Sequence, residues 1–227
     1  MELYKIDLPM PSEELVELGK EVILTAIKYA KSLDAKWLNE FHGNGTDSVS
    51  HYFGSHLESM ELTNRIQQEY SHCFPGVELG SYYGIMRGDY ATTGKLKTQP
   101  PHVDGSRNVN LNYYVELGGD DVQTWFYDVI GPMDRTEPVH YKKTEIDSLG
   151  YCKFNTKEWY LFNGNQCHSV ENVKTDRYFF AITFVDNISD KRKRMLESSN
   201  LTNKFINPSA EGRSEYTLQD VLDVLQS

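Results

Sequence analysis

Residues 109–117, VNLNYYVEL, alternate two kinds of side chain, and this alternation decides the fold class. One series is apolar or aromatic and the other is more polar: Val109, Leu111, Tyr113, Val115 and Leu117 against Asn110, Asn112, Tyr114 and Glu116. Successive side chains of a strand point to opposite faces, so this period of two predicts a β-strand with one apolar and one polar face. The polar face lies either in solvent or along the mouth of a barrel.

Short runs rich in Tyr, Phe, Val and Thr continue on both sides of this stretch from residue 78 onward, separated by Gly, Pro, Asn and Asp. Such runs are typical of strands joined by turns. Five strands are predicted: Leu79–Arg87, Val109–Leu117, Val122–Ile130, Glu158–Phe162 and Arg177–Val185. We therefore expect a mainly β fold with flanking helices, built on a double-stranded β-helix core of the jelly-roll or cupin-like kind.

Segments outside this β region have the helical spacing of apolar residues. Residues 12–32 show it after Ser12, which is available as a cap, and a second helix is predicted from Ser59 to about Ser71. Thr217 can cap a terminal helix, and the apolar face of that helix either docks onto the core or contacts a partner. That face consists of Leu218, Val221, Leu222 and Leu225.

The 227 residues suit one domain, because a single β-sandwich or barrel can use roughly 200 to 250 residues. Within the single domain 1–227 we expect three parts. They are N-terminal helical support over 1–75, a jelly-roll catalytic core over 78–187, and a C-terminal extension with the terminal helix over 188–227.

Composition disfavours several classes of partner. The net charge of −10 disfavours nucleic acid and anionic membranes, and no run reaches the roughly 18 apolar residues of a membrane span. The first residues lack the basic and apolar regions of a signal peptide, and the 3 cysteines lack a zinc-like spacing. We therefore expect a cytoplasmic protein with neither a nucleic-acid partner nor a membrane.

Two histidines and one acid form a candidate metal site. His102 and Asp104 are two positions apart, so in an extended segment both side chains project to the same side and can reach one ion. With His168 they make a set of two histidines and one carboxylate, which leaves coordination positions open and is typical of non-haem Fe(II) oxygenases. A surface histidine beside an aspartate is the alternative for the first pair taken alone.

Arg177 follows His168 by nine positions and is the candidate partner of an acid. Its planar, permanently charged fork holds a carboxylate through paired hydrogen bonds. The residues that follow it, YFFAITF, look buried, and a buried arginine needs an anion; an exposed arginine on an edge strand is the alternative. Two antiparallel strands with a short link are expected to bring His168 and Arg177 together. If the polar face of 109–117 lines the barrel, Tyr114 offers its hydroxyl to the same acid.

These residues lie in segments that resemble the Fe(II)/2-oxoglutarate-dependent dioxygenases, within their prolyl-hydroxylase-like branch. The resemblance rests on SYYGIMRGD (81–89), PPHVDGSRNVNLNYYVE (100–116) and YLFNGNQCHSVENVKTDRYFFAITFVD (160–186). It implies that His102, Asp104 and His168 bind iron, that Arg177 holds the far carboxylate of 2-oxoglutarate, and that Tyr114 assists. One departure is Met86, which stands where that branch commonly presents a tyrosine; Tyr82 and Tyr83 are the candidate substitutes.

The resemblance also implies the activity. With Fe(II), 2-oxoglutarate and O2, and with ascorbate in support, such an oxidoreductase hydroxylates a substrate C–H bond and releases succinate and CO2. The resemblance favours a prolyl residue of a polypeptide as substrate. A free amino acid, a nucleoside or another small metabolite is the alternative within the same enzyme class. A cupin-like module that binds metal without turnover is the alternative outside it.

Overall fold

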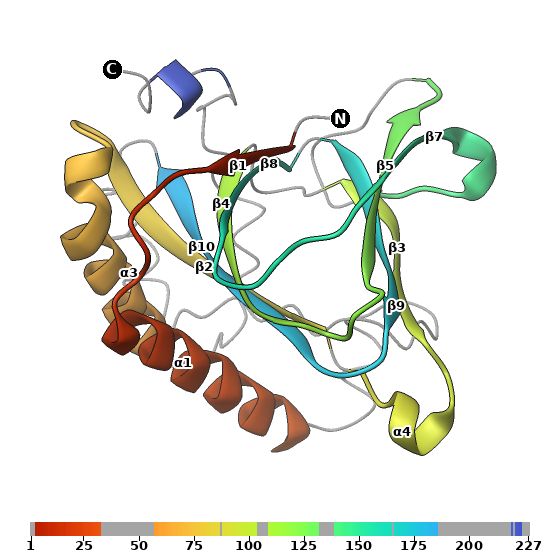
Figure 1. Ribbon diagram of the computed structural model, residues 1–227, viewed down its shortest axis with the longest axis horizontal. Helices are drawn as coiled ribbons and strands as arrows, with labels where there is room; N and C mark the ends of the chain where they lie inside the picture. Colours follow the sequence, from red (N-terminus) through yellow and green to blue (C-terminus); the bar gives the residue numbers. More distant parts are fainter. Residues whose placement is uncertain are drawn as a thin grey trace.

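The computed structural model describes residues 3–32, 57–86, 88–103, 109–131, 139–164, 166–185, 219 and 221–223. Within them, ten strands form two five-stranded antiparallel sheets that face each other (Figure 1). We name the sheet of order β1-β8-β4-β10-β2 sheet A, and the sheet of order β6-β3-β9-β5-β7 sheet B. The expectation of a mainly β fold with flanking helices is confirmed.

Sheet A consists of β1 (Leu3–Ile6), β2 (Glu78–Met86), β4 (Val109–Leu117), β8 (Trp159–Asn163) and β10 (Arg177–Val185). Sheet B consists of β3 (Lys97–Val103), β5 (Gln123–Val129), β6 (Val139–His140), β7 (Ile146–Cys152) and β9 (Cys167–Val173). The helices are α1 (Glu13–Ser32), α3 (Leu57–Tyr70) and α4 (Tyr90–Thr93), with 3-10 turns η1 (Ser71–Cys73) and η2 (Lys143–Glu145).

The five predicted strands are present with ends within one residue of the prediction, apart from Arg87, which lies outside the described residues. The expectation that the strand before His168 pairs with the strand of Arg177 is wrong. His168 lies inside β9 of sheet B, whereas β8 and β10 are both in sheet A and are separated there by β4. The sequence did not predict β3, because its residues, KTQPPHV, include two prolines and no apolar alternation.

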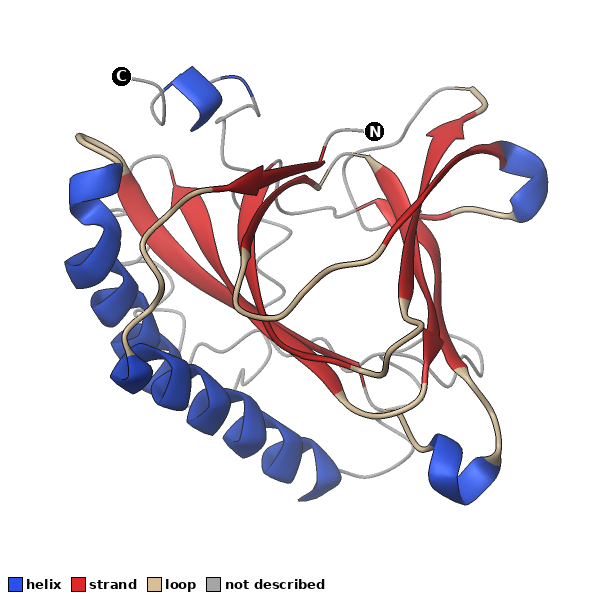
Figure 2. Ribbon diagram, viewed as in Figure 1, coloured by secondary structure: helices blue, strands red, loops and turns tan. Residues whose placement is uncertain are grey.

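Helices α1 and α3 cover the face of sheet A that is turned away from sheet B (Figure 2). Their apolar sides close the main core against alternate residues of β4 and β10. The core residues of these elements are Leu15, Val22, Ile23, Leu62, Ile66, Tyr70, Val109, Leu111, Tyr113, Phe180, Ile182 and Phe184. The apolar face of 109–113 therefore packs on helices, and the opposite face is left to look toward sheet B.

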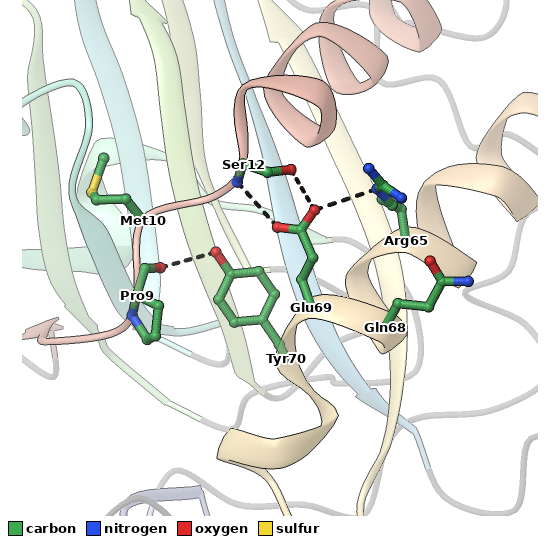
Figure 3. Close-up of a pocket in the computed structure, with 7 residues that line it drawn as sticks. All are labelled: Pro9, Met10, Ser12, Arg65, Gln68, Glu69 and Tyr70. Atoms are coloured by element: carbon green, nitrogen blue, oxygen red, sulfur yellow. Dashed lines mark hydrogen bonds and ion pairs between the residues drawn. The ribbon is translucent and has the colours of Figure 1, made fainter.

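The start of α1 is tied to α3 (Figure 3). Ser12 caps α1 as predicted, since its hydroxyl accepts a hydrogen bond from the Leu15 N–H at 3.1 Å. Glu69 of α3 accepts hydrogen bonds from the Ser12 N–H and hydroxyl, and Arg65 lies 3.4 Å from the same carboxylate.

A surface groove of about 420 Å³ runs here, and one of about 490 Å³ lies beside it, both outside sheet A. The first is lined by Pro9, Met10, Ser12, Arg65, Gln68, Glu69 and Tyr70.

The predicted terminal helix is described at residues 219 and 221–223, which are helical. Val221 is buried in the core shared by α1, α3 and sheet A, and Leu222 packs against it. Of the two alternatives for this helix, docking onto the core is therefore the one observed for these residues. Separately, no helix in the described part of the chain has the length and apolarity needed to cross a membrane.

Gly19 sets how closely α1 approaches sheet A. A Cβ atom at this position would lie 2.8 Å from Cδ1 of Phe180, whose ring is fully buried. In an exposed helix, Gly→Ala gains about 1 kcal/mol, but overpacking a rigid core costs about 1 to 3 kcal/mol. We expect Gly19→Ala to lower the free energy of unfolding in urea, and Glu21→Ala, at an exposed position of the same helix, to leave it nearly unchanged. A gain in stability for Gly19→Ala would contradict this packing.

Candidate metal and acid-binding site

His102 and His168 meet between the sheets. The two residues are paired in the register of β3 and β9, and their ring centroids are 4.3 Å apart. Both are buried, with 5% and 7% of their surface exposed. The ring of Phe162 in sheet A packs edge-on against His168 at 4.6 Å, so the pair faces the interior and not the outside of sheet B.

The backbone fixes the tautomer of each histidine. Nδ1 of His102 lies 2.9 Å from the carbonyl oxygen of Pro100, and Nδ1 of His168 lies 2.9 Å from that of Gln166. A carbonyl oxygen only accepts, so Nδ1 carries the proton in each ring and Nε2 keeps its lone pair. The amide nitrogen of Gln99, 2.9 Å from Nε2 of His102, agrees with this assignment because it donates. Histidines held in this way by a carbonyl are typical of metal ligands.

Asp104, the third predicted ligand, lies outside the described residues. Among the residues that the structure does describe, no third His, Cys, Asp or Glu joins the histidine pair to complete a metal site. Of the three predicted ligands, the structure therefore describes two, His102 and His168, whose imidazoles converge with tautomers that suit metal binding. Two neutral imidazoles and one carboxylate form a donor set that suits Fe(II) and leaves positions open.

Arg177 begins β10 and is 5% exposed, so the alternative of an exposed edge arginine is wrong. Its guanidinium carbon lies 4.7 Å from the ring centroid of Tyr114 and 5.6 Å from that of Phe154. Its Nη2 donates to the hydroxyl of Thr124 in sheet B at 3.4 Å. No carboxylate of the described residues pairs with it, and a buried cation without an anion is costly. The arrangement is therefore suited to a bound acid.

The polar face of β4 looks into the space between the sheets, where Asn112 and Tyr114 are buried. The register between β4 and β10 shifts at Tyr178/Phe179, which marks a β-bulge. Val115 consequently packs with the helix-covered core, whereas Leu117 packs with Tyr114. The expectation that Leu117 shares the face of Val115 is wrong, because the extra residue of the bulge reverses the alternation.

The end of β4 fits closely around Arg177. Leu117 is the register partner of Arg177, and Gly118 follows with φ +85°. A Cβ atom on Gly118 would lie 2.9 Å from Cβ of Arg177, so glycine satisfies both the left-handed backbone and the close approach. The carbonyl oxygen of Gly118 accepts from the N–H groups of Lys174 and Thr175 at 2.8 and 3.0 Å. These bonds anchor the link between β9 and β10 that carries Arg177.

Burial controls the protonation of two groups beside Arg177. Burial raises the pKa of Tyr114, and the nearby Arg177 offsets this only in part, so the hydroxyl is a donor at neutral pH. Burial likewise raises the pKa of Cys152 to about 11, again with Arg177 acting in the opposite direction. The thiol of Cys152 is therefore neutral at neutral pH, which leaves Arg177 as the charged group of this cluster.

Thr124, which contacts Arg177, and His168 lie on neighbouring strands of sheet B. In the pairing of β5 with β9, Phe126 is opposite His168, and Thr124, the hydrogen-bond partner of Arg177, is opposite Val170. Thr124 and His168 are thus two residue positions apart along the sheet, or roughly 7 Å at the rise of a strand. A short dicarboxylic acid is of the right size to reach from one end to the other.

The two candidate substitutes for a tyrosine at Met86 have different surroundings. Tyr82 faces the interior, where its ring centroid is 6.0 Å from that of Phe179, whereas Tyr83 is part of the helix-covered core. Met86 itself packs between the sheets with Val122, Val170 and Val173. Of the two tyrosines, Tyr82 is therefore the one on the face of the candidate site.

Sequence reasoning missed Gln99, Thr124 and Phe154. Gln99 contacts His102, and Thr124 and Phe154 contact Arg177. Thr124 could have been considered, because it lies near the start of the predicted strand Val122–Ile130, whose alternate residues share one face. Phe154 lies outside every strand and offered no such signal.

No protein-family model matches this sequence, and no curated protein matches it. Among solved structures, the X-ray structure of ycfD from E. coli aligns with a TM-score of 0.33 and 10% sequence identity. The alignment covers 73% of this chain and 43% of that chain, so this chain spans less than half of that structure.

Proposed function

We propose that this protein is an Fe(II)- and 2-oxoglutarate-dependent dioxygenase that hydroxylates a substrate C–H bond. One observation carries the proposal. Two buried histidines, each with Nδ1 bonded to a backbone carbonyl, lie in the same inter-sheet space as Arg177, which has no carboxylate partner among the described residues. Metal ligands and an acid-binding cation at this separation suit an acid that chelates iron at one end.

We also propose that the two sheets form a double-stranded β-helix. In support, consecutive strands alternate between sheets for most of the chain: β2, β4, β8 and β10 are in sheet A, and β3, β5, β7 and β9 are in sheet B. The orders β2-β10-β4-β8 and β3-β9-β5-β7 are those expected when a long antiparallel hairpin is rolled into two facing sheets. This arrangement puts β3 and β9, with their histidines, side by side.

The residues would form two parts of one site in the space between the sheets, a metal site and an acid-binding site. His102, His168 and Asp104 would hold iron, and Arg177 with Tyr114 would hold the far carboxylate of 2-oxoglutarate. Bound Fe(II) supplies the redox chemistry: 2-oxoglutarate, O2 and R–H give succinate, CO2 and R–OH. The aromatic rings of Tyr114, Phe154 and Phe179 exclude water around the arginine, which strengthens its interaction with an acid.

A prolyl residue of a polypeptide is the first substrate class to test, because the sequence resembles the prolyl-hydroxylase-like branch. Free amino acids, nucleosides and other small metabolites are the second. A metal-binding module without turnover accounts less well for the buried Arg177, since a purely structural metal site has no need of an acid-binding cation in the same chamber.

Anaerobic titration of the Fe(II)-loaded protein with 2-oxoglutarate tests the proposal. We expect a saturable visible charge-transfer band, because the keto acid would chelate iron through its 2-oxo acid end. Succinate, which lacks the 2-oxo group but carries both carboxylates, is the control and should give no band. Bound iron without a band at saturating 2-oxoglutarate would refute the proposed co-substrate.

A further inference from the structure

Gln99 on β3 lies against His102, one of the two histidines of the candidate metal site. Its amide nitrogen is 2.9 Å from Nε2 of that ring. Nδ1 of the same ring donates to the carbonyl oxygen of Pro100, so Nε2 is an acceptor and the amide faces it with an N–H. Both side chains are buried, with 9% of Gln99 and 5% of His102 exposed. The side chain of Gln99 therefore donates to the atom of His102 that would bind the metal.

The backbone of β3 builds this contact. In the pairing with β9, Gln99 is opposite Val170 and His102 is opposite His168, and the register shifts between these two pairs. Three positions on β3 thus match two on β9, as happens where a strand contains the extra residue of a bulge. Residues three apart in a regular strand point to opposite faces, and the extra residue turns Gln99 and His102 to the same one. The dipeptide between them, Pro100–Pro101, suits a bulge because proline has no N–H for the ladder.

The amide and a metal ion need the same lone pair. Nε2 of a neutral imidazole has one lone pair in the plane of the ring, so it accepts a hydrogen bond or binds a metal, but not both at once. Metal binding at His102 therefore requires that the Gln99 amide give up this hydrogen bond. The Pro100 carbonyl already holds Nδ1 in place, so the Gln99 contact is not needed to aim the ring. The contact thus lowers the affinity for a metal without being required to form the site.

We propose that Gln99 sets the metal concentration at which the candidate site fills. Its amide competes with the metal for Nε2 of His102, so the site binds a divalent ion less tightly than it would without this amide. The inference rests on the proposed function, since it assumes that His102 and His168 are metal ligands. It makes Gln99 a regulator of metal occupancy and not a metal ligand.

Calorimetric titration with Mn(II) tests this proposal, on protein freed of metal by a chelator. Gln99→Leu keeps a side chain of similar size and removes the amide. We expect Mn(II) to bind this variant about threefold to tenfold more tightly, because one hydrogen bond to Nε2 no longer has to be broken. Gln123→Leu is the matched control and should bind like the wild type. Gln123 is adjacent to the inward Thr124 on β5 and so points to the opposite face of sheet B.

Nitrogen NMR of the metal-free protein gives a second readout, which a merely structural role would not move. In Gln99→Leu the Nε2 resonance of His102 should shift downfield, because it loses a hydrogen-bond donor. The Nδ1 resonance should stay, because the Pro100 carbonyl still accepts from it. Gln99→Asn shortens the side chain by one methylene and so withdraws the amide from the ring. It should show the same tighter binding and the same shift of Nε2.

Thermal unfolding of each variant separates competition from support of the fold. Equal or weaker Mn(II) binding by Gln99→Leu and Gln99→Asn at an unchanged melting temperature, or an unchanged Nε2 resonance, would overturn the inference. Weaker binding together with a lower melting temperature would mean that Gln99 supports the fold, and would overturn it as well. Absence of Mn(II) binding by the wild-type protein would instead refute the metal site of the proposed function, and this inference with it.

Discussion

His168→Ala is expected to abolish 2-oxoglutarate-dependent succinate release and to weaken Fe(II) binding by more than about 100-fold. Disturbing a residue that merely orients a metal ligand costs about 10- to 100-fold in affinity, and removing the ligand itself costs at least as much. His168 is one of two imidazoles that converge between the sheets, each with Nδ1 donating to a backbone carbonyl and with the lone pair on Nε2. Equilibrium dialysis against iron and a coupled assay for succinate measure the two effects.

His72→Ala is the matched control, because His72 is exposed in η1 and belongs to no part of the candidate site. It should bind iron and turn over like the wild type. His102→Ala should behave like His168→Ala, since the two rings are register partners. Full turnover by either His102→Ala or His168→Ala would refute the assignment of the metal site.

Arg177→Met is expected to weaken 2-oxoglutarate binding by about 100-fold while leaving the fold at least as stable. Each hydrogen bond to a charged group contributes about 1.5 to 3 kcal/mol, and the variant removes the charged fork that makes them. The methionine keeps an unbranched side chain against Tyr114 and Phe154. A buried charge without a carboxylate partner costs free energy. Replacing it by an apolar residue is therefore not expected to lower the stability of the fold. Calorimetry gives the affinity and thermal unfolding gives the stability.

Arg177→Lys separates the charge from its geometry. Lysine keeps a positive charge but offers no planar pair of donors, so we expect binding weakened by about tenfold, between the wild type and Arg177→Met. Equal binding by all three proteins would mean that the acid does not contact residue 177. A large fall in the melting temperature of Arg177→Met would mean that the arginine stabilises the fold through its contacts with Tyr114, Phe154 and Thr124.

The types of residue in the candidate site were predictable from the sequence, and their partners were not. Alternation over 109–117 correctly predicted a strand with two different faces, one of which packs on the main core. It left open whether the polar face lies in solvent or inward, and the burial of Asn112 and Tyr114 decided for the inward position. The same alternation predicted the wrong face for Leu117. A bulge depends on how β4 pairs with β10, and the sequence of either strand alone does not determine that pairing.

Thr124 was missed because its role arises from Arg177, which is distant in sequence. Gln99 was missed although His102 is close in sequence, because no strand was predicted over β3.

By itself the sequence determined the class of fold and the chemistry of the side chains, since strand period, helix period and the properties of His, Asp and Arg are local. Only the tertiary structure decided that His102 pairs with His168, that both rings turn Nδ1 to a carbonyl, and that Arg177 lies between Tyr114, Phe154 and Thr124. The physical reason is that register, bulges and contacts between sheets are set by pairing among strands far apart in the chain. A one-residue change in any of these pairings would turn the same side chains away from one another.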